Sequence, residues 1–451
     1  MQHPETDPAP QAAPPARHPV QYGSFRAYLF GRLSAMLAQY GMMIVLGWQA
    51  YNIARETMGT QGAAAQLGLI GLAQFLPLFL LTPVTGWVAD HFDRRLIVRA
   101  TLLLLIAGAS LMALATFEGW VTLPLIFLIA VLVGIARAFN GPAFSALAPN
   151  LVPKESLPRA IALSSVAWQS GSIVGPAMGG YIYALTPWGA YATSALLYVV
   201  AMTAMLLIGK VPQAARDLTR HPLRQMVDGL SYVRQNRFLL ATITLDLFAV
   251  LLAGATALLP VYARDILQVG SQGLGHLAAA PAIGAAVTAL WFSFRPMERE
   301  VGVRMLAAVI IFGMATIVFG LTAFMPHGIA MEVALASLVV LGSADMVSVY
   351  IRSSLIQLYT PDAMRGRVGS VSQLTISASN ELGEAESGFL AALVGPVTAV
   401  IAGGIGAIII TLAWARLFPE IRLARSFDPP DIRPNGAPAP PFAPTAKETT
   451  T

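Results

Sequence analysis

Residues 306–324 read LAAVIIFGMATIVFGLTAF, a run without a charged side chain. A helix needs about 20 consecutive apolar residues to cross a bilayer, and soluble domains rarely contain such runs. Similar runs recur at 102–117 and 123–139. They do not alternate apolar and polar residues, as the strands of a membrane barrel would. The sequence therefore predicts an all-α integral membrane protein with several spanning helices.

Composition narrows the function. The 451 residues are 56% hydrophobic and 11% charged, whereas a soluble globular protein is about 25% charged. The chain has no cysteine, which excludes disulfides, thiolate metal sites and cysteine nucleophiles. The six histidines show no metal-ligand spacing, and no G-x-x-x-x-G-K-[ST] phosphate loop occurs. We expect no metal, no cofactor and no enzymatic activity.

Twelve spanning helices account for the apolar segments. We place them at 28–53, 65–89, 96–117, 121–145, 160–184, 189–209, 238–260, 274–294, 303–324, 330–351, 368–391 and 395–417. They predict five regions: a disordered tail 1–24, a first six-helix bundle 25–209, a linker 210–237, a second six-helix bundle 238–417 and a proline-rich tail 418–451. Low apolar content keeps proline-rich tails from folding.

Charge distribution orients these helices. If both termini are cytoplasmic, 23 of the 28 lysines and arginines lie in cytoplasmic segments, and only Arg55 and Arg264 lie in outer loops. This asymmetry is the positive-inside pattern and predicts a multi-pass protein of the plasma membrane. Basic loops beside an anionic leaflet also explain the net charge of +5 without nucleic acid.

The longest internal loop divides the helices six and six. Within it, RHPLRQMVDGLSYVRQNR at 220–237 alternates basic and apolar residues and predicts a helix lying on the inner membrane surface. A plan of two six-helix halves is typical of secondary transporters that bind their substrate between the halves. We expect a small molecule, protons and the bilayer as partners, and a monomer.

The loop between the second and third helices reads GWVADHFDRRL, residues 86–96. It resembles the G-x-L-a-D-r-x-G-r-[KR] signature of the major facilitator superfamily through Gly86, Asp90, Arg94 and Arg95. Asp93 stands where that family usually has its second glycine. The resemblance implies a cytoplasmic conformational latch, whereas ordinary positive-inside charge is the plainer alternative.

Two further motifs point to an exporter. RAFNGPA at 137–143 resembles the family's R-x-x-q-G-x-g motif, with Asn140 for glutamine. The resemblance implies that Arg137 takes part in proton coupling, although Arg137 could instead extend to the inner surface. GSIVGPAMGG at 171–180 matches G-x-x-x-G-P-x-x-G-G at every fixed position: Gly171, Gly175, Pro176, Gly179 and Gly180. In the superfamily this pattern marks proton-exchanging exporters, and its small residues let helices approach closely.

Several longer stretches resemble the enterobactin-exporter-like branch of the superfamily. They are 25–51, 67–81, 360–371 and SNELGEAESGF at 379–389. The resemblance covers about residues 25–425 and implies efflux of a siderophore-like metabolite or a drug. An importer of the same fold and a non-transporting receptor remain the alternatives.

Acidic side chains inside predicted helices are the coupling candidates. Burial disfavours the charged form of a carboxyl group, so a buried acid can exchange protons near neutral pH. At 100° per residue, Glu381 and Glu384 share one helix face, and we expect them to face a central cavity while Glu386 packs elsewhere. Asp246 and Asp345 lie in other apolar segments. A purely structural role for each acid is the alternative to coupling.

Overall fold

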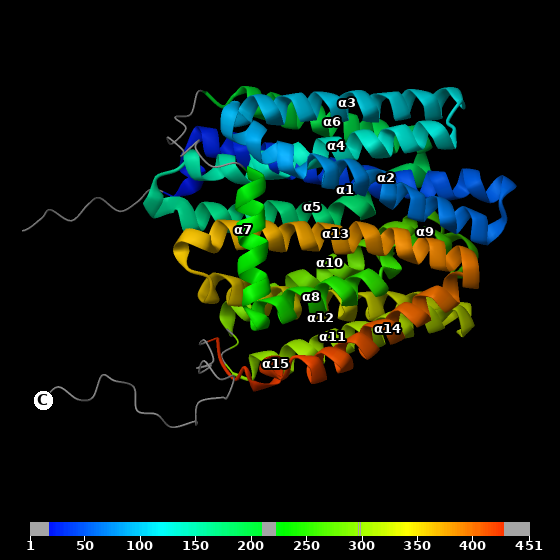
Figure 1. Cartoon of the computed structure of the whole chain (residues 1–451). Helices are drawn as coiled ribbons and strands as arrows, with labels where there is room; N and C mark the ends of the chain where they lie inside the picture. Colours follow the sequence, from blue (N-terminus) through cyan, green and yellow to red (C-terminus); the bar gives the residue numbers. More distant parts are fainter. Residues whose placement is uncertain (1–17, 210–221, 296, 298, 428–451) are drawn as a thin grey trace, which may run out of the picture.

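The computed structural model describes residues 18–209, 222–295, 297 and 299–427. The predicted tail segments 1–17 and 428–451 and the linker residues 210–221 therefore lie outside the described residues. Within the described residues the chain is helical, and its long helices run roughly parallel to one another (Figure 1).

The first half of the chain forms six long helices. They are α1 (Gly23–Thr57), α2 (Gly59–His91), α3 (Arg94–Glu118), α4 (Leu123–Leu147), α5 (Leu157–Leu185) and α6 (Pro187–Leu206). The second half forms α8 (Arg237–Leu252), α10 (Gly270–Phe294), α11 (Val301–Leu321), α12 (His327–Tyr359), α13 (Asp362–Val394) and α14 (Pro396–Leu417). Each corresponds to one predicted span.

Ten of these segments are long and apolar enough to cross a membrane. Of the twelve helices, α5 and α13 fall short in hydropathy, although they have 29 and 33 residues. Their small and polar side chains explain the difference. Each of the two helices packs along a helix of the other half, α5 on α10 and α13 on α2. The predicted fold of twelve spanning helices is therefore consistent with the structure.

The seventh span is broken. After α8 ends at Leu252, the chain continues through the 3₁₀ turn η4 (Ala255–Leu258), the short α9 (Leu259–Val261) and the π turn η5 (Tyr262–Ile266). A side chain at Gly254 would collide with the Gly383 carbonyl of α13. Glycine here lets the backbone of the break lie directly against α13.

The predicted surface helix is α7 (Pro222–Gln235), which crosses the ends of the long helices (Figure 1). Its Asp228 accepts a hydrogen bond from Arg367 of α13 at 3.2 Å. Val227 and Leu230 on α7 are 61% and 56% exposed. An exposed apolar face beside basic residues suits a helix at the lipid boundary.

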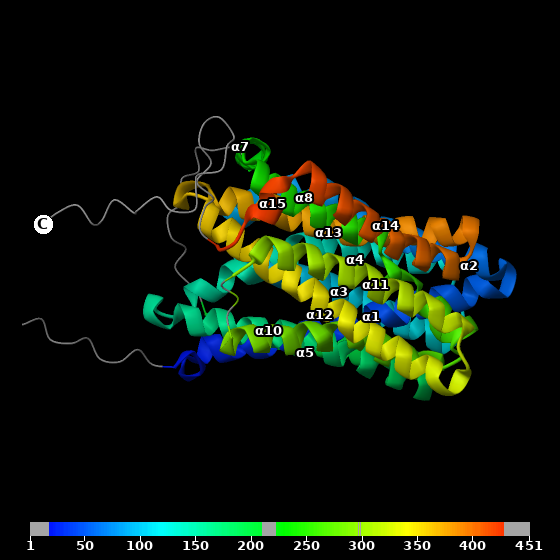
Figure 2. The same cartoon turned by 90° about the horizontal axis from the view of Figure 1, so that it is seen from below.

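Two helix pairs join the two halves. In the first pair, α2 packs along α13, and in the second, α5 packs along α10; Figure 2 shows α5 and α10 side by side. The site described next lies at mid-depth where α2 and α4 meet α13.

Candidate functional site

An ion pair connects the halves at mid-depth. Nη1 of Arg137 on α4 lies 2.6 Å from Oε1 of Glu381 on α13. The Glu381 side chain is 3% exposed and that of Arg137 is 25% exposed. Arg137 also donates a hydrogen bond to Oε1 of Gln74 on α2, at 3.3 Å. Arg137 is therefore paired inside the bundle in this structure, and its part in proton coupling stays a prediction.

Glu384 lies one helical turn from Glu381, against α2. A Cβ atom at Gly71 would lie 3.0 Å from the Glu384 Cβ and 3.3 Å from its Oε2. Gly71 therefore leaves the space that this carboxyl group occupies. Arg137 interacts electrostatically with both glutamates. One cation of the first half thus faces two carboxyl groups of the second half.

The expectation that Glu381 and Glu384 face a central cavity stays a prediction. In this structure Glu381 is 2% exposed, and its carboxylate is paired with Arg137 of α4. The neighbouring Asn380 on α13 is exposed. Glu386 points away from the pair, as predicted, and its Oε2 accepts a hydrogen bond from Ser387 at 3.4 Å.

Two aromatic side chains lie beside this site. Tyr40 of α1 interacts electrostatically with Arg137 and Glu381 and lies near Trp168 of α5. The Trp168 side chain is 43% exposed. The site therefore combines one cation, two carboxyl groups and an accessible indole.

A second acidic group lies within the second half. Asp246 of α8 is 4% exposed and forms an ion pair with Arg352 of α12. Its Oδ1 also accepts a hydrogen bond from Ser348 at 3.4 Å. Asp345, Asp246 and Ser348 line a small cavity of about 10 Å³, which is close to the space that one water molecule needs. The predicted acids therefore fall into two separate groups.

Asn140 lies one turn from Arg137 on α4. It is 4% exposed, and its Oδ1 has no hydrogen-bond partner among the described residues. Among the described residues, no hydrogen bond from either glutamate to this oxygen is present. Its predicted role in coupling stays a prediction.

The glycines of α5 divide between two neighbours. A Cβ atom at Gly175 would lie 2.8 Å from the Tyr40 Cβ, and one at Gly179 would lie 2.6 Å from the Gly41 carbonyl oxygen. Gly171 meets α1 in the same way, whereas Gly180 meets Ser271 and Gly275 of α10. α5 continues past Pro176 to Leu185. The motif therefore packs α5 against α1 on one side and against the second half on the other.

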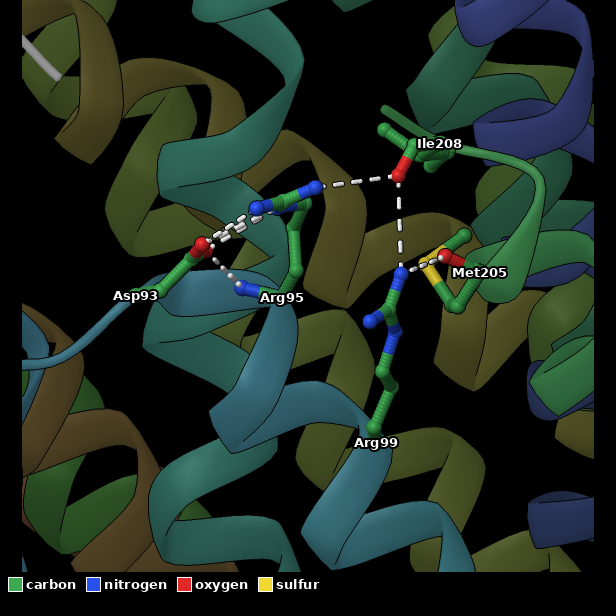
Figure 3. Close-up of polar contacts among 5 residues, drawn as sticks. All are labelled: Asp93, Arg95, Arg99, Met205 and Ile208. Atoms are coloured by element: carbon green, nitrogen blue, oxygen red, sulfur yellow. Dashed lines mark hydrogen bonds and ion pairs between the residues drawn. The ribbon is translucent and has the colours of Figure 1, made fainter. Parts of the chain in front are cut away.

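The predicted latch is described in part. Gly86 and the Asp90 side chain lie outside the residues whose side chains the structure describes, and Arg94 is buried. Arg95 contacts Asp93 through Nη2 at 2.5 Å and donates to the Ile208 carbonyl at 3.1 Å (Figure 3). These contacts tie the start of α3 to the chain just after α6.

Two residues of this corner were not predicted to have a role. Asp93 is the N-cap of α3, and its Oδ1 accepts from the Arg95 backbone N–H at 3.0 Å. Arg99 donates to the Met205 carbonyl at 2.8 Å (Figure 3). Hydrogen bonds from Arg95 hold the pKa of Asp93 below its usual value of 3.8. An aspartate directly before a helix is a recognisable cap signal, whereas nothing local predicts the partner of Arg99.

Comparison with known proteins identifies the family. The model of the family described as "Transmembrane secretion effector" matches residues 34–435. The chain belongs to this family. Because the match spans most of both halves, it confirms the resemblance to major facilitator transporters. A transporter rather than an enzyme is thereby established.

Named relatives cover nearly the whole chain. The enterobactin exporter of Shigella flexneri is 28% identical over 413 residues, covering 90% of this chain and 94% of the relative. That of Escherichia coli O6:K15:H31 (strain 536) is 27% identical over 424 residues, covering 92% and 96%. The match includes both halves and the linker between them.

Solved transporters share the fold. A bacterial homologue of the human lysosomal transporter Spinster, crystallised facing inward and occupied, superposes with a TM-score of 0.68 at 15% identity, covering 90% of this chain and 99% of that one. The D-xylose–proton symporter superposes with a TM-score of 0.67 at 12% identity, covering 87% and 98%. The predicted fold of two six-helix bundles is confirmed.

Proposed function

We propose that this chain exports a siderophore-like metabolite from the cell in exchange for protons, by alternating access across the bacterial inner membrane with both termini in the cytoplasm. The observation that carries the proposal is the Arg137–Glu381 ion pair, which bridges the halves at 2.6 Å beside Glu384. Relatives named as enterobactin exporters support the direction and the class of cargo.

The site suggests how the exchange proceeds. With Glu381 neutralised by Arg137, Glu384 is the acid left to take up a proton. Uptake of that proton on a carboxylate oxygen removes one negative charge facing Arg137, so the balance of attraction between α4 and α13 changes. A ligand shifts a conformational equilibrium only if it binds the two conformations with different affinity. A proton whose uptake changes the attraction between α4 and α13 meets this condition and can couple proton entry to conformational switching.

Nearby exposed side chains suggest what the cargo must be. Trp168 offers an aromatic face and Asn380 offers an amide. An aromatic face favours planar or cationic groups, and an amide both donates and accepts hydrogen bonds. Together they suit a polar metabolite that carries aromatic rings. Protons as the second partner and a monomer as the working unit are further parts of the proposal.

The test compares metabolites inside and outside cells. Cells lacking the gene are compared with cells expressing wild type, Glu384→Gln or Glu386→Gln, with and without iron. We expect the cargo to accumulate inside the deletion strain and to return to the medium with wild type and Glu386→Gln but not with Glu384→Gln. Glu386 is the matched control because it lies on α13 but away from Arg137.

Each other outcome has a defined meaning. Full export by Glu384→Gln would remove the proton-carrying role from this residue and move the test to Asp345. If a metabolite enters cells faster when the protein is expressed, the protein is an importer and not an exporter. A symporter with the same fold makes this the alternative to test.

A further inference from the structure

A second set of polar contacts joins the halves at the opposite end from α7. Tyr51 of α1 donates a hydrogen bond to Oδ2 of Asp265 in η5, at 2.5 Å. Nε of Arg55, one turn further along α1, lies 3.0 Å from the same oxygen. The side chains of Arg55 and Asp265 are 32% and 22% exposed, and Tyr51 is fully buried. One carboxylate of the second half therefore receives two donors of the first half.

A further hydrogen bond runs in the opposite direction, from a donor in the second half to an acceptor in the first half. Nη1 of Arg264 donates to the backbone carbonyl of Asn52 on α1, at 3.2 Å. Arg264 and Asp265 are consecutive, yet both reach α1. The π turn makes this possible, because its wider backbone changes the angle between successive side chains, and π turns are frequent at functional sites.

Contacts within the second half hold the π turn in place. The backbone N–H of Leu267 donates to the Tyr262 carbonyl at 2.7 Å. The Tyr262 ring is fully buried and stacks on Phe319 of α11, with ring centroids 4.3 Å apart. Asp265 is thus presented to α1 from a rigid base, which favours a specific contact over a chance one.

Other contacts brace the same end. Tyr181 of α5 and His276 of α10 form a hydrogen bond at 2.9 Å. A side chain at Gly68 of α2 would meet Gly388 of α13 at 3.1 Å. Hydrogen bonds and ion pairs join the two halves both at mid-depth and at this end. The contacts at this end hold it closed.

We infer that Tyr51, Arg55 and Asp265 form an outer clamp that keeps the release side shut until the transporter switches. Here "outer" rests on the proposed function and on the predicted orientation, in which Arg55 and Arg264 are the two basic residues of the outer loops. An exporter must open this end to discharge its cargo, so the clamp sets how often the outward-open form occurs.

The test measures distance rather than transport. Because the chain has no cysteine, spin labels can be attached at Glu118→Cys at the end of α3 and His327→Cys at the start of α12. Both positions are exposed, and they lie in different halves. Distances are measured by double electron–electron resonance on the full chain reconstituted in lipid nanodiscs, in the wild-type background and with Asp265→Asn, Tyr51→Phe or Glu56→Gln.

We expect Asp265→Asn to add a longer distance and to raise the ratio of open to closed molecules about five- to thirtyfold, the factor that corresponds to one or two kcal/mol. Tyr51→Phe removes one hydroxyl group and should shift the ratio less, in the same direction. Glu56→Gln removes an exposed carboxylate beside Arg55 and should leave the distances unchanged.

Unchanged distances in both Asp265→Asn and Tyr51→Phe would overturn the clamp. If Asp265→Asn does not fold, Tyr51→Phe decides alone, since it keeps the buried ring. The result is independent of the proposed export. If the distances shift but the protein exports nothing, the clamp is supported and the proposed function is rejected. If the protein exports its cargo but the distances do not change, the function is supported and the clamp is rejected.

Discussion

The Arg137–Glu381 pair supports a quantitative prediction about stability. At the observed 2.6 Å, two unit charges attract by about 6 kcal/mol at an effective dielectric constant of about 20. Burying the two ions costs several kcal/mol each, so the intact pair adds little net stability. Removing one partner is different, because it leaves the other charge buried and unpaired at a cost of about 3–5 kcal/mol. Since Arg137 is 25% exposed, we expect the lower end, about 3 kcal/mol.

The measurement is a double-mutant cycle. Purified Arg137→Gln, Glu381→Gln and the double variant are unfolded by denaturant in mild detergent. Each single variant should lose about 3 kcal/mol, while the double variant should lose less than either. A cycle of Arg137→Gln with Glu386→Gln is the control and should be additive. If the loss in the Arg137–Glu381 double variant equals the sum of the two single losses, the two side chains do not interact and the reasoning is refuted.

Three further predictions concern other contacts. Asp93→Ala should cost about 1 kcal/mol through loss of the helix cap, whereas Asp93→Asn keeps the cap. The pKa of Asp93 is lowered in the folded protein, so its charge stabilises the protein at pH values above its usual pKa. This stabilisation is lost as the pH falls through the lowered pKa of the folded protein. The gap between wild type and Asp93→Asn should thus narrow from pH 7 to pH 3 in denaturant midpoints, and a widening gap would contradict this sign. Gly175→Ala should cost about 1–3 kcal/mol by overpacking α5 on α1, while Gly369→Ala, with nothing within 4 Å, should not destabilise; equal thermal stability of the two would refute the packing argument. Asp246→Asn should cost about 3–5 kcal/mol because it leaves a buried arginine unpaired, and Asp345→Asn less, as compared by thermal unfolding in detergent.

Many helix ends could be predicted from the sequence to within a few residues, but α12 continues to Tyr359, eight residues beyond the predicted 330–351. The bilayer makes this possible, because each span must be long and apolar. The predicted 395–417 and the observed Pro396–Leu417 are an example. The broken seventh span was missed, although Gly254 and Pro260 were visible signals. The composition of the break does not reveal it, because η4 (Ala255–Leu258) and α9 (Leu259–Val261) are as apolar as a regular helix.

Side-chain partners could not be predicted in the same way. The sequence identified Arg137 and Glu381 as unusual, because charges in lipid are costly. Their pairing depends on how α4 and α13 pack, and these helices are far apart in the chain. Asp246 and Arg352 show the same limit, because their pairing depends on how α8 and α12 pack.

The length of α13 has a mechanical consequence. Its 33 residues form one unbroken helix of about 50 Å, well beyond the roughly 30 Å of hydrocarbon that it crosses. The helix carries the acidic site near its middle, touches α7 near one end and packs on α2 toward the other. A rigid tilt of α13 about a point near Glu381 would therefore move its two ends in opposite directions. A tilt of about 10° around that point would displace each end by about 4 Å at 1.5 Å per residue, enough to break a hydrogen bond at either face. A charge change at mid-depth would then reach both surfaces of the membrane at once.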